Sequence, residues 1–201
     1  MKIQFSDGSN IFKDIVMIDK EKIHKAVELF LEAIGEDSSR SGLLDTPERV
    51  ARMCDELFSG MEKDAAEPLE RVFSVERPGL VIEKDIRFYS LCEHHLLPFF
   101  GTVSIAYMYE DKVTGLSKLA RTVEIFARRL QIQENMTSQI ADAVMKALKP
   151  KGVMVVVQAE HLCMSMRGVK NPGARTMTFC ALGSFEKDLE LQNHVLKNLG
   201  L

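Results

Sequence analysis

Tryptophan is absent from this 201-residue chain, and cysteine is scarce, with only four residues. Cysteines this few, scattered between Cys54 and Cys180, do not make a disulfide scaffold, so we expect thiols that fill the core or bind a metal. No run of about 18 apolar residues occurs, so we expect no membrane-spanning helix. Internal repeats and low-complexity linkers are also missing, which argues against a solenoid or an array.

Neither sign of charge dominates, because 26 Lys and Arg residues against 29 Asp and Glu residues give a net charge of −3. Without a general basic field we expect no nucleic-acid partner, although a local basic pocket for one phosphorylated small molecule is compatible with this balance. The first ten residues lack the apolar core and the small-residue cleavage site of a signal peptide. The expected location is therefore cytoplasmic.

Hydrophobic periodicity predicts an α+β domain. Helical spacing predicts helices at about 20–34, 46–58, 117–130 and 187–199, and another that follows the third and ends at about 148. Asp19, Thr46 and Ser117 are the expected N-caps. Alternating patterns predict strands at about 85–90, 103–107, 153–157 and 176–182. Two strand pairs that flank two helices indicate a four-stranded antiparallel sheet with two helices on one face. Prolines near 66–80 suggest a boundary between an N-terminal helical segment, 1–66, and the sheet domain, 67–201.

Two clusters of Cys and His follow predicted strands. A thiolate and an imidazole three residues apart, as in Cys92 and His95, can bind one zinc ion from a tight turn. Cys163 supplies a third ligand if the first and third strands meet. Three protein ligands leave one position open for water, as in catalytic zinc sites. His94 and His161 remain as imidazoles for proton transfer.

Three other interpretations of these clusters are less favoured. A lone Cys or His is more often a core or surface residue than a ligand, and only the pairing of the two clusters favours a metal. A zinc deaminase would need a C-x-x-C motif, which the chain lacks. A structural zinc site would need a fourth ligand, and Cys54 and Cys180 fit apolar stripes better.

The segment 115–121, G-L-S-K-L-A-R, combines a Ser-capped helix start with two cations. Free N–H groups at a helix N-terminus attract anions, and Lys118 and Arg121 add charged donors on one face. Arg167 can add a guanidinium from the metal side. Taken alone, the segment is more typical of an ordinary solvated helix start.

A polar stretch, Gln131 to Glu134, lies between two predicted helices. A carboxylate such as that of Glu134 can accept two N–H bonds from a guanine-type edge, and the amide of Gln133 can both donate and accept. When the stretch is considered alone, a polar interhelical turn is the favoured explanation.

Together these segments resemble GTP cyclohydrolase I over about residues 20–186. The matching strings are G-L-L-D-T-P-E-R-V-A-R-M at 42–53, C-E-H-H-L-L-P-F-F-G at 92–101, G-L-S-K-L-A-R at 115–121, R-L-Q-I-Q-E at 129–134 and H-L-C-M-S-M-R-G-V at 161–169. The resemblance implies a tunnelling fold and a toroidal homodecamer with active sites at subunit contacts.

The resemblance also implies a hydrolase that converts GTP and water to 7,8-dihydroneopterin triphosphate and formate, the first step of tetrahydrofolate and pterin biosynthesis. One zinc per subunit, with iron as the alternative, would be held by Cys92, His95 and Cys163. His94 and His161 would be the catalytic imidazoles, with Ser117 assisting proton movement in the later steps.

The same match implies the substrate contacts. Gln133 and Glu134 would hold the guanine ring, and the ribose or triphosphate would be bound by Ser117, Lys118, Arg121 and Arg167. Arg49 and Arg52 would reach the triphosphate from a neighbouring subunit. Where the family often has Ser-x-Thr-x-Thr, this chain has Ala174 in place of the first Ser. A relative acting on another pterin or deazapurine, and a catalytically silent binding protein, are the alternative functions.

Overall fold

The computed structural model describes residues 18–201. The chain forms two compact units, the first ending at Asp55 and the second running from Glu56 to Leu201. The domain boundary expected after residue 66 stays a prediction. Across the described residues, none of the helices combines the length and the hydrophobicity needed to cross a bilayer.

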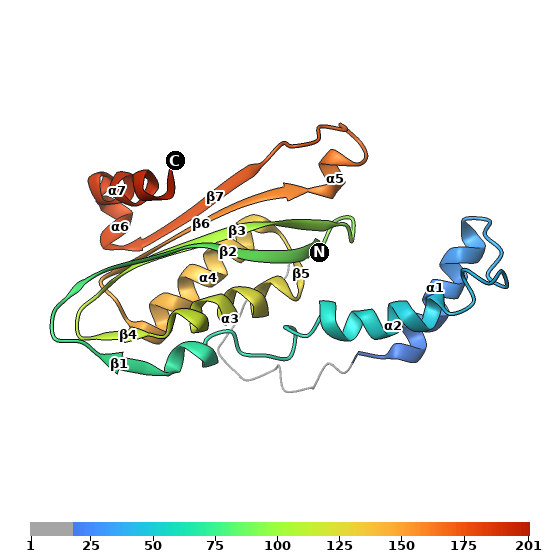
Figure 1. Cartoon of the computed structure of the whole chain (residues 1–201), viewed down its shortest axis with the longest axis horizontal. Helices are drawn as coiled ribbons and strands as arrows, with labels where there is room; N and C mark the ends of the chain where they lie inside the picture. The colour runs from blue at the N-terminus through green and yellow to red at the C-terminus, as the bar shows by residue number, and fades with distance from the viewer. Residues whose placement is uncertain (1–17) are drawn as a thin grey trace, which may run out of the picture. The chain divides into compact units, whose positions relative to one another are not determined.

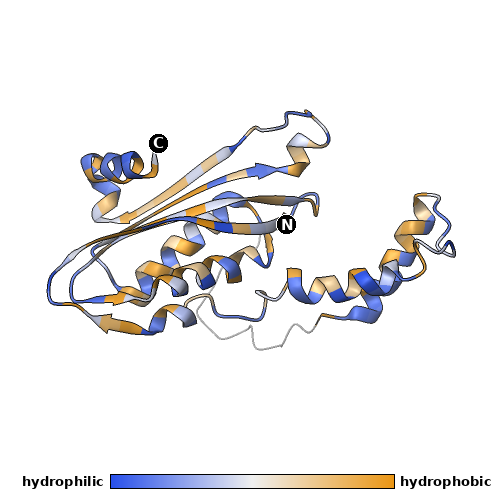
Figure 2. Cartoon of the chain, in the orientation of Figure 1, coloured by the Kyte–Doolittle hydropathy of each residue, from blue (hydrophilic) through white to orange (hydrophobic). Residues whose placement is uncertain are grey.

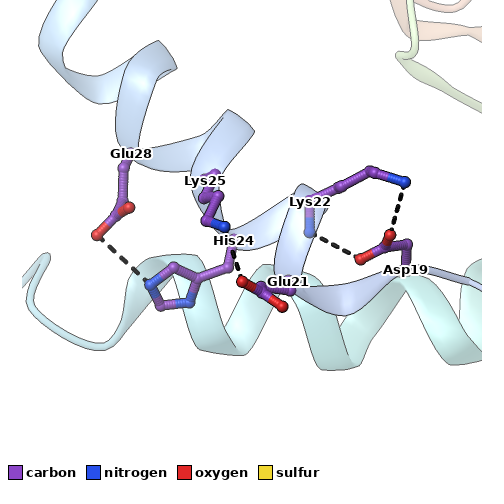
Figure 3. A network of polar contacts seen from close by, with 6 residues as sticks. All are labelled: Asp19, Glu21, Lys22, His24, Lys25 and Glu28. Carbon is purple, nitrogen blue, oxygen red and sulfur yellow. Dashed lines mark hydrogen bonds and ion pairs between the residues drawn. The ribbon is translucent and has the colours of Figure 1, made fainter.

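The first unit contains two helices at the positions that the periodicity predicts. Helix α1 (Lys20–Ala33) is capped by the Asp19 carboxylate, which accepts from the Lys22 main-chain N–H at 3.0 Å. Polar contacts continue along its surface, among them Lys25 to Glu21 at 2.7 Å, as Figure 3 shows. Helix α2 (Thr46–Leu57) has the expected Thr-Pro pair in its first turn, but Thr46 is its first helical residue and not its N-cap.

The apolar stripe of α1 is buried less than its spacing predicts. Leu31 is 7% exposed, but Phe30 is 62% and Ile34 57% exposed. On α2, Cys54 is buried whereas Met53 is 48% exposed. Part of the apolar stripe on each helix therefore remains exposed in the described structure.

The second unit is built on a sheet whose strand order is β5-β2-β3-β6-β7 (Figure 1). The strands are β2 (Gly79–Cys92), β3 (Pro98–Tyr109), β5 (Leu130–Gln131), β6 (Gly152–His161) and β7 (Thr176–Gly183). The four long strands are antiparallel, which confirms the predicted four-stranded antiparallel sheet of an α+β domain. Strand β5 was not predicted; its two residues pair in parallel with Leu91 and Cys92 of β2.

Helices α3 (Leu116–Ala127) and α4 (Gln133–Leu148) cover one face of this sheet, as expected (Figure 1). The core between the two layers includes Val123, Ile140 and Val155, each 0% exposed. Figure 2 shows the apolar residues concentrated along β6 and on parts of both helices. The expected Ser117 N-cap is wrong. Gly115 occupies that position, and Ser117 lies inside the first turn of α3.

Smaller elements complete the second unit, and none of those before α7 was predicted. They are η1 (Glu67–Glu70), the paired strands β1 (Val72–Ser74) and β4 (Lys112–Thr114), and the short helices α5 (Leu162–Ser165) and α6 (Ser184–Lys187). The last helix, α7 (Leu189–Leu199), matches the predicted C-terminal helix. Val195 of α7 and Phe185 of α6 pack with Met154 and Val156 in a second apolar cluster.

Candidate active site

A tight turn follows β2 and presents the first Cys and His cluster. The Cys92 N–H donates to Leu97 O at 2.9 Å, and the Leu96 N–H donates to Cys92 O at 2.8 Å. Leu96 has a φ of 55°, the left-handed conformation that such a sharp reversal needs. The turn is attached to β5 because the Glu93 N–H donates to Gln131 O at 3.1 Å.

The second cluster reaches the same end of the sheet from β6. His161 is the last residue of β6 and lies opposite Phe99 in the β3–β6 register. The first and third predicted strands correspond to β2 and β6, which do not pair because β3 lies between them. The chain leaves the extended conformation at Leu162, so Cys163 comes from the helical turn α5 and not from an extended strand end.

Three potential ligand atoms converge at this end of the sheet. The sulfur atoms of Cys92 and Cys163 and a ring nitrogen of His95 all lie within 4.8 Å of one another. Small side-chain rotations would let one ion with bonds of about 2.0–2.3 Å contact all three. Within residues 18–201, no fourth Cys, His, Asp or Glu joins the group.

The chemistry of this donor set fits a borderline-soft divalent cation. Thiolate and imidazole are the ligands that zinc and iron prefer, whereas magnesium and calcium prefer oxygen. Burial raises the pKa of the Cys163 thiol, and the adjacent Cys92 sulfur raises it further. Two sulfurs this close are unfavourable as a pair of thiolates unless a cation compensates their charge.

The two remaining imidazoles differ in their surroundings. His94 lies on the exposed side of the turn, whereas His161 is half-buried. Burial lowers the pKa of His161, and the negative charge of Glu134 opposes this effect only in part. His161 is therefore a neutral imidazole near pH 7.

A cavity of about 250 Å³ joins the three potential ligands to the start of α4. Seven predicted residues line it: Cys92, His94, His95, Gln133, Glu134, His161 and Cys163. Four lining residues were not singled out as site residues: Gln131, Ile132, Met164 and Thr176. The first three adjoin motif residues in sequence. Thr176 is signalled by the alternation Thr176–Thr178, which points both side chains to one face of β7.

The predicted triphosphate residues on α3 do not line this cavity. Helix α3 starts next to β4 and ends shortly before β5, the strand beside Cys92. Its 12 residues span about 18 Å. Ser117 and Lys118 therefore lie near the far end of the helix, while Arg121 lines a separate cavity of about 270 Å³ with Arg87 and Arg128.

Three other arginines complete the predicted set. Arg167 follows α5, four residues after Cys163, and its positive charge slightly opposes the rise in the pKa of the Cys163 thiol. Arg49 pairs with Asp45 at 3.1 Å and Arg52 with Glu48 at 3.6 Å. Both belong to the first unit and are about two-thirds exposed.

Comparison with known proteins identifies the same family that the motifs suggest. A sequence model described as GTP cyclohydrolase I matches residues 23–200. GTP cyclohydrolase 1 of Finegoldia magna is 55% identical over 184 residues, covering 92% of this chain and 100% of that protein. GTP cyclohydrolase 1 of Pelotomaculum thermopropionicum is 57% identical over 174 residues, covering 86% of this chain and 93% of that protein.

One solved structure is more distantly similar. The crystal structure of the archaeosine synthase QueF-Like in the apo form has a TM-score of 0.44 and 21% identity, covering 54% of this chain and 98% of that one. The family assignment does not depend on this likeness.

Proposed function

We propose that this chain, which belongs to the GTP cyclohydrolase I family, opens the guanine ring of GTP at the cavity beside Cys92, His95 and Cys163. The reaction converts GTP and water to 7,8-dihydroneopterin triphosphate and formate, the first step of tetrahydrofolate biosynthesis. The observation that carries the proposal is the meeting of a three-ligand group, two further histidines and a carboxylate in one cavity. The cytoplasm remains the expected location.

Cys92, His95 and Cys163 would hold one metal ion per subunit, zinc or iron. Such an ion, when bound, supplies Lewis acidity that makes water a stronger nucleophile near neutral pH. Because no fourth ligand joins the group within the described part of the chain, a tetrahedral ion held there would keep one position for solvent. Metal analysis of the purified protein decides between zinc and iron, since both suit this donor set.

The guanine ring would be held at the start of α4. Glu134 is exposed in the cavity, and its carboxylate can accept from the ring N1–H and the 2-amino group. Gln133 is the first residue of α4, where main-chain N–H groups have no helical partner and can donate to the guanine carbonyl. These contacts would orient the C8 edge of the purine toward the metal ligands.

His161 and His94 would move the protons that ring opening and ring closure require. Hydration of the C8–N7 bond puts the water oxygen on C8 and one of its protons on N7. A neutral imidazole accepts and returns such a proton near pH 7, and His161 is held in that state by burial. Ser117 would assist in the later ribose rearrangement.

The triphosphate would be bound with the help of a second subunit. Strand β7 pairs only with β6, and most of β2 is unpaired on its outer side within residues 18–201. If β2 of one copy pairs with β7 of another, the neighbour's α3, which packs on its β2, comes beside Thr176 in the cavity. This supports a homo-oligomer, expected to be a decamer, in which Lys118 and Arg121 act across the subunit contact.

Exposed apolar side chains at these two edges support such pairing. Phe179 on β7 is 55% exposed and Tyr89 on β2 is 62% exposed. Apolar area of this kind favours burial against another copy. Arg167 would contact the triphosphate from the metal side, and Arg49 and Arg52 would reach it from a neighbouring subunit.

Incubation of the metal-loaded protein with GTP tests the proposed function. Formate and, after oxidation, a fluorescent pterin are expected. The His161→Ala variant is the matched control, because it should keep metal and GTP binding while turnover falls by about 100-fold or more. If neither product forms with GTP, the proposal fails; turnover of another pterin or of a deazapurine, or binding without turnover, would identify the alternative functions.

A further inference from the structure

The side chain of Gln133 is buried at the base of the cavity and is fully engaged in hydrogen bonds. It is 2% exposed. Its Nε2 donates to Val157 O at 3.2 Å, to Thr176 O at 3.1 Å and to Thr178 Oγ1 at 3.1 Å. Strands β6 and β7 thus supply three acceptors to one amide, which has no free N–H left for a substrate.

These partners determine which way the amide faces. Two of them are main-chain carbonyls, which only accept, so the NH₂ group must face β6 and β7. The Oε1 atom of Gln133 then faces His161 and lies 2.7 Å from its Nε2. An amide oxygen only accepts, and the hydrogen in this bond therefore belongs to Nε2 of His161.

Two threonines extend the same chain of hydrogen bonds. Thr137 Oγ1 donates its one hydrogen to Gln133 O at 2.7 Å. The 2.7 Å contact between Thr137 Oγ1 and Thr178 Oγ1 must then be donated by Thr178. Every donor and acceptor in this chain of hydrogen bonds can therefore be assigned without conflict, from Thr178 through the Gln133 amide to the His161 imidazole. We call His161, Gln133, Thr178 and Thr137 the histidine relay.

We propose that Gln133 is a positioning residue whose side chain holds His161 as the Nε2–H tautomer, so that Nδ1 is the nitrogen that exchanges protons with the substrate. The inference rests on the proposed function and deepens it. Gln133 then has two separate tasks, since its main chain faces the guanine and its side chain orients the imidazole.

The assignment specifies the direction of the first proton transfer. In the Nε2–H tautomer only Nδ1 has a lone pair. Nδ1 can take one proton from water while the water oxygen bonds to C8, and the same proton can pass from Nδ1 to N7 as the C8–N7 double bond becomes single. Throughout, the hydrogen stays bonded to Nε2, which donates it to Gln133 Oε1, and this hydrogen bond also stabilises the transient imidazolium. His161 acts first as a base and only then as an acid.

Nitrogen NMR of the metal-loaded protein tests the tautomer directly. The protein is labelled with ¹⁵Nδ1-histidine and measured in the solid state, which suits a large oligomer, at a pH at which free imidazole is neutral. The His161 signal is assigned by its loss in His161→Gln. We expect this signal at the position of a ring nitrogen without hydrogen. An Nδ1–H signal overturns the inference, whether or not the protein turns over GTP.

Variants of the relay separate positioning from a merely structural role. Gln133→Met keeps the length of the side chain and removes the acceptor, so we expect a mixture of both tautomers in the His161 signal. Thr178→Val removes the hydroxyl and should lower kcat by about tenfold with a smaller change in KM for GTP. Thr178→Ser keeps the hydroxyl and should restore kcat.

The control is Thr102→Val, the same exchange on β3 outside the relay, which should leave kcat and the His161 signal unchanged. Equal kcat in Thr178→Val, Thr178→Ser and the native protein would contradict the relay. An inactive native protein whose Nδ1 signal has the expected position would instead contradict the proposed function and leave the tautomer assignment intact.

Discussion

The imidazole of His161 lies flat on the ring of Phe99, with the ring centroids 4.7 Å apart and the planes 5° apart. The two residues are opposite one another in the β3–β6 register. Phe99 is 0% exposed and is held in turn by an edge-on contact with Phe88, at 5.6 Å between centroids. The stack fixes the plane of the imidazole, whereas the bond to Gln133 fixes its rotation within that plane.

Replacing Phe99 with Leu should therefore affect both stability and turnover. Loss of aromatic packing in the core should lower the free energy of unfolding by about 1–3 kcal/mol. Release of the His161 ring should lower kcat more than it raises KM for GTP. Denaturation and formate release measure the two effects. Phe100→Leu is the control, since Phe100 packs on Tyr89 and not on His161, and its kcat should stay near the native value.

Cys163→Ser should release the bound metal and abolish formate production, because a serine hydroxyl is a much poorer ligand for zinc or iron than a thiolate. Metal content per subunit is the measurement. The matched control is Cys180→Ser on β7, a half-buried free cysteine outside the three-ligand group, which should keep its metal. Full metal content in Cys163→Ser would remove Cys163 from the ligand set.

Two inactive variants should restore activity to each other if the site draws on two subunits. Cys163→Ser disables the metal half of a site, and Arg121→Ala disables the triphosphate half. Coexpressed in equal amounts, they should regain about one quarter of native activity per site if subunits mix at random.

The pair Cys163→Ser and His161→Ala is the control for that experiment. Both residues line the same cavity of one chain, so each half-site in a mixed oligomer carries one of the two defects. Coexpression of these variants should therefore restore no activity. If Cys163→Ser and Arg121→Ala also restore nothing while mixed oligomers form, the sharing of a site between subunits is wrong.

Gly101→Ala should destabilise the sheet beside the active site. A Cβ on Gly101 would collide with the main-chain oxygen of Gln158 and lie 2.8 Å from Ala159 Cα, so β6 would have to move away from β3. We expect a loss of about 2 kcal/mol or more, seen as a lower unfolding temperature at fixed protein concentration. Gly115→Ala, whose Cβ would approach no heavy atom closer than 3.7 Å, should unfold near the native temperature.

The helices and strands were predictable because their signals are local. Asp19 before an apolar stripe at 3.6-residue spacing marks α1, and the alternation Ile86, Phe88 and Ser90 marks β2, whose buried face carries these three residues. The Cys and His clusters were recognisable for the same reason, since ligand type and short spacing are written in adjacent residues. The prediction of Ser117 as an N-cap was wrong because a serine near a helix start is typical of a cap, whereas the backbone conformation makes Gly115 the N-cap of α3.

The amino-acid sequence by itself determined the main helices, the four long strands, the donor atoms and the family, all of which depend on residue identity and local spacing. Only the tertiary structure decided that β3 separates β2 from β6, that Cys163 arrives on a helical turn, and that the cations of α3 are remote from the metal ligands of the same chain. It also turned the Gln133 amide toward His161. These outcomes depend on contacts between residues far apart in the chain, and no local pattern records which distant partners a buried polar group will find.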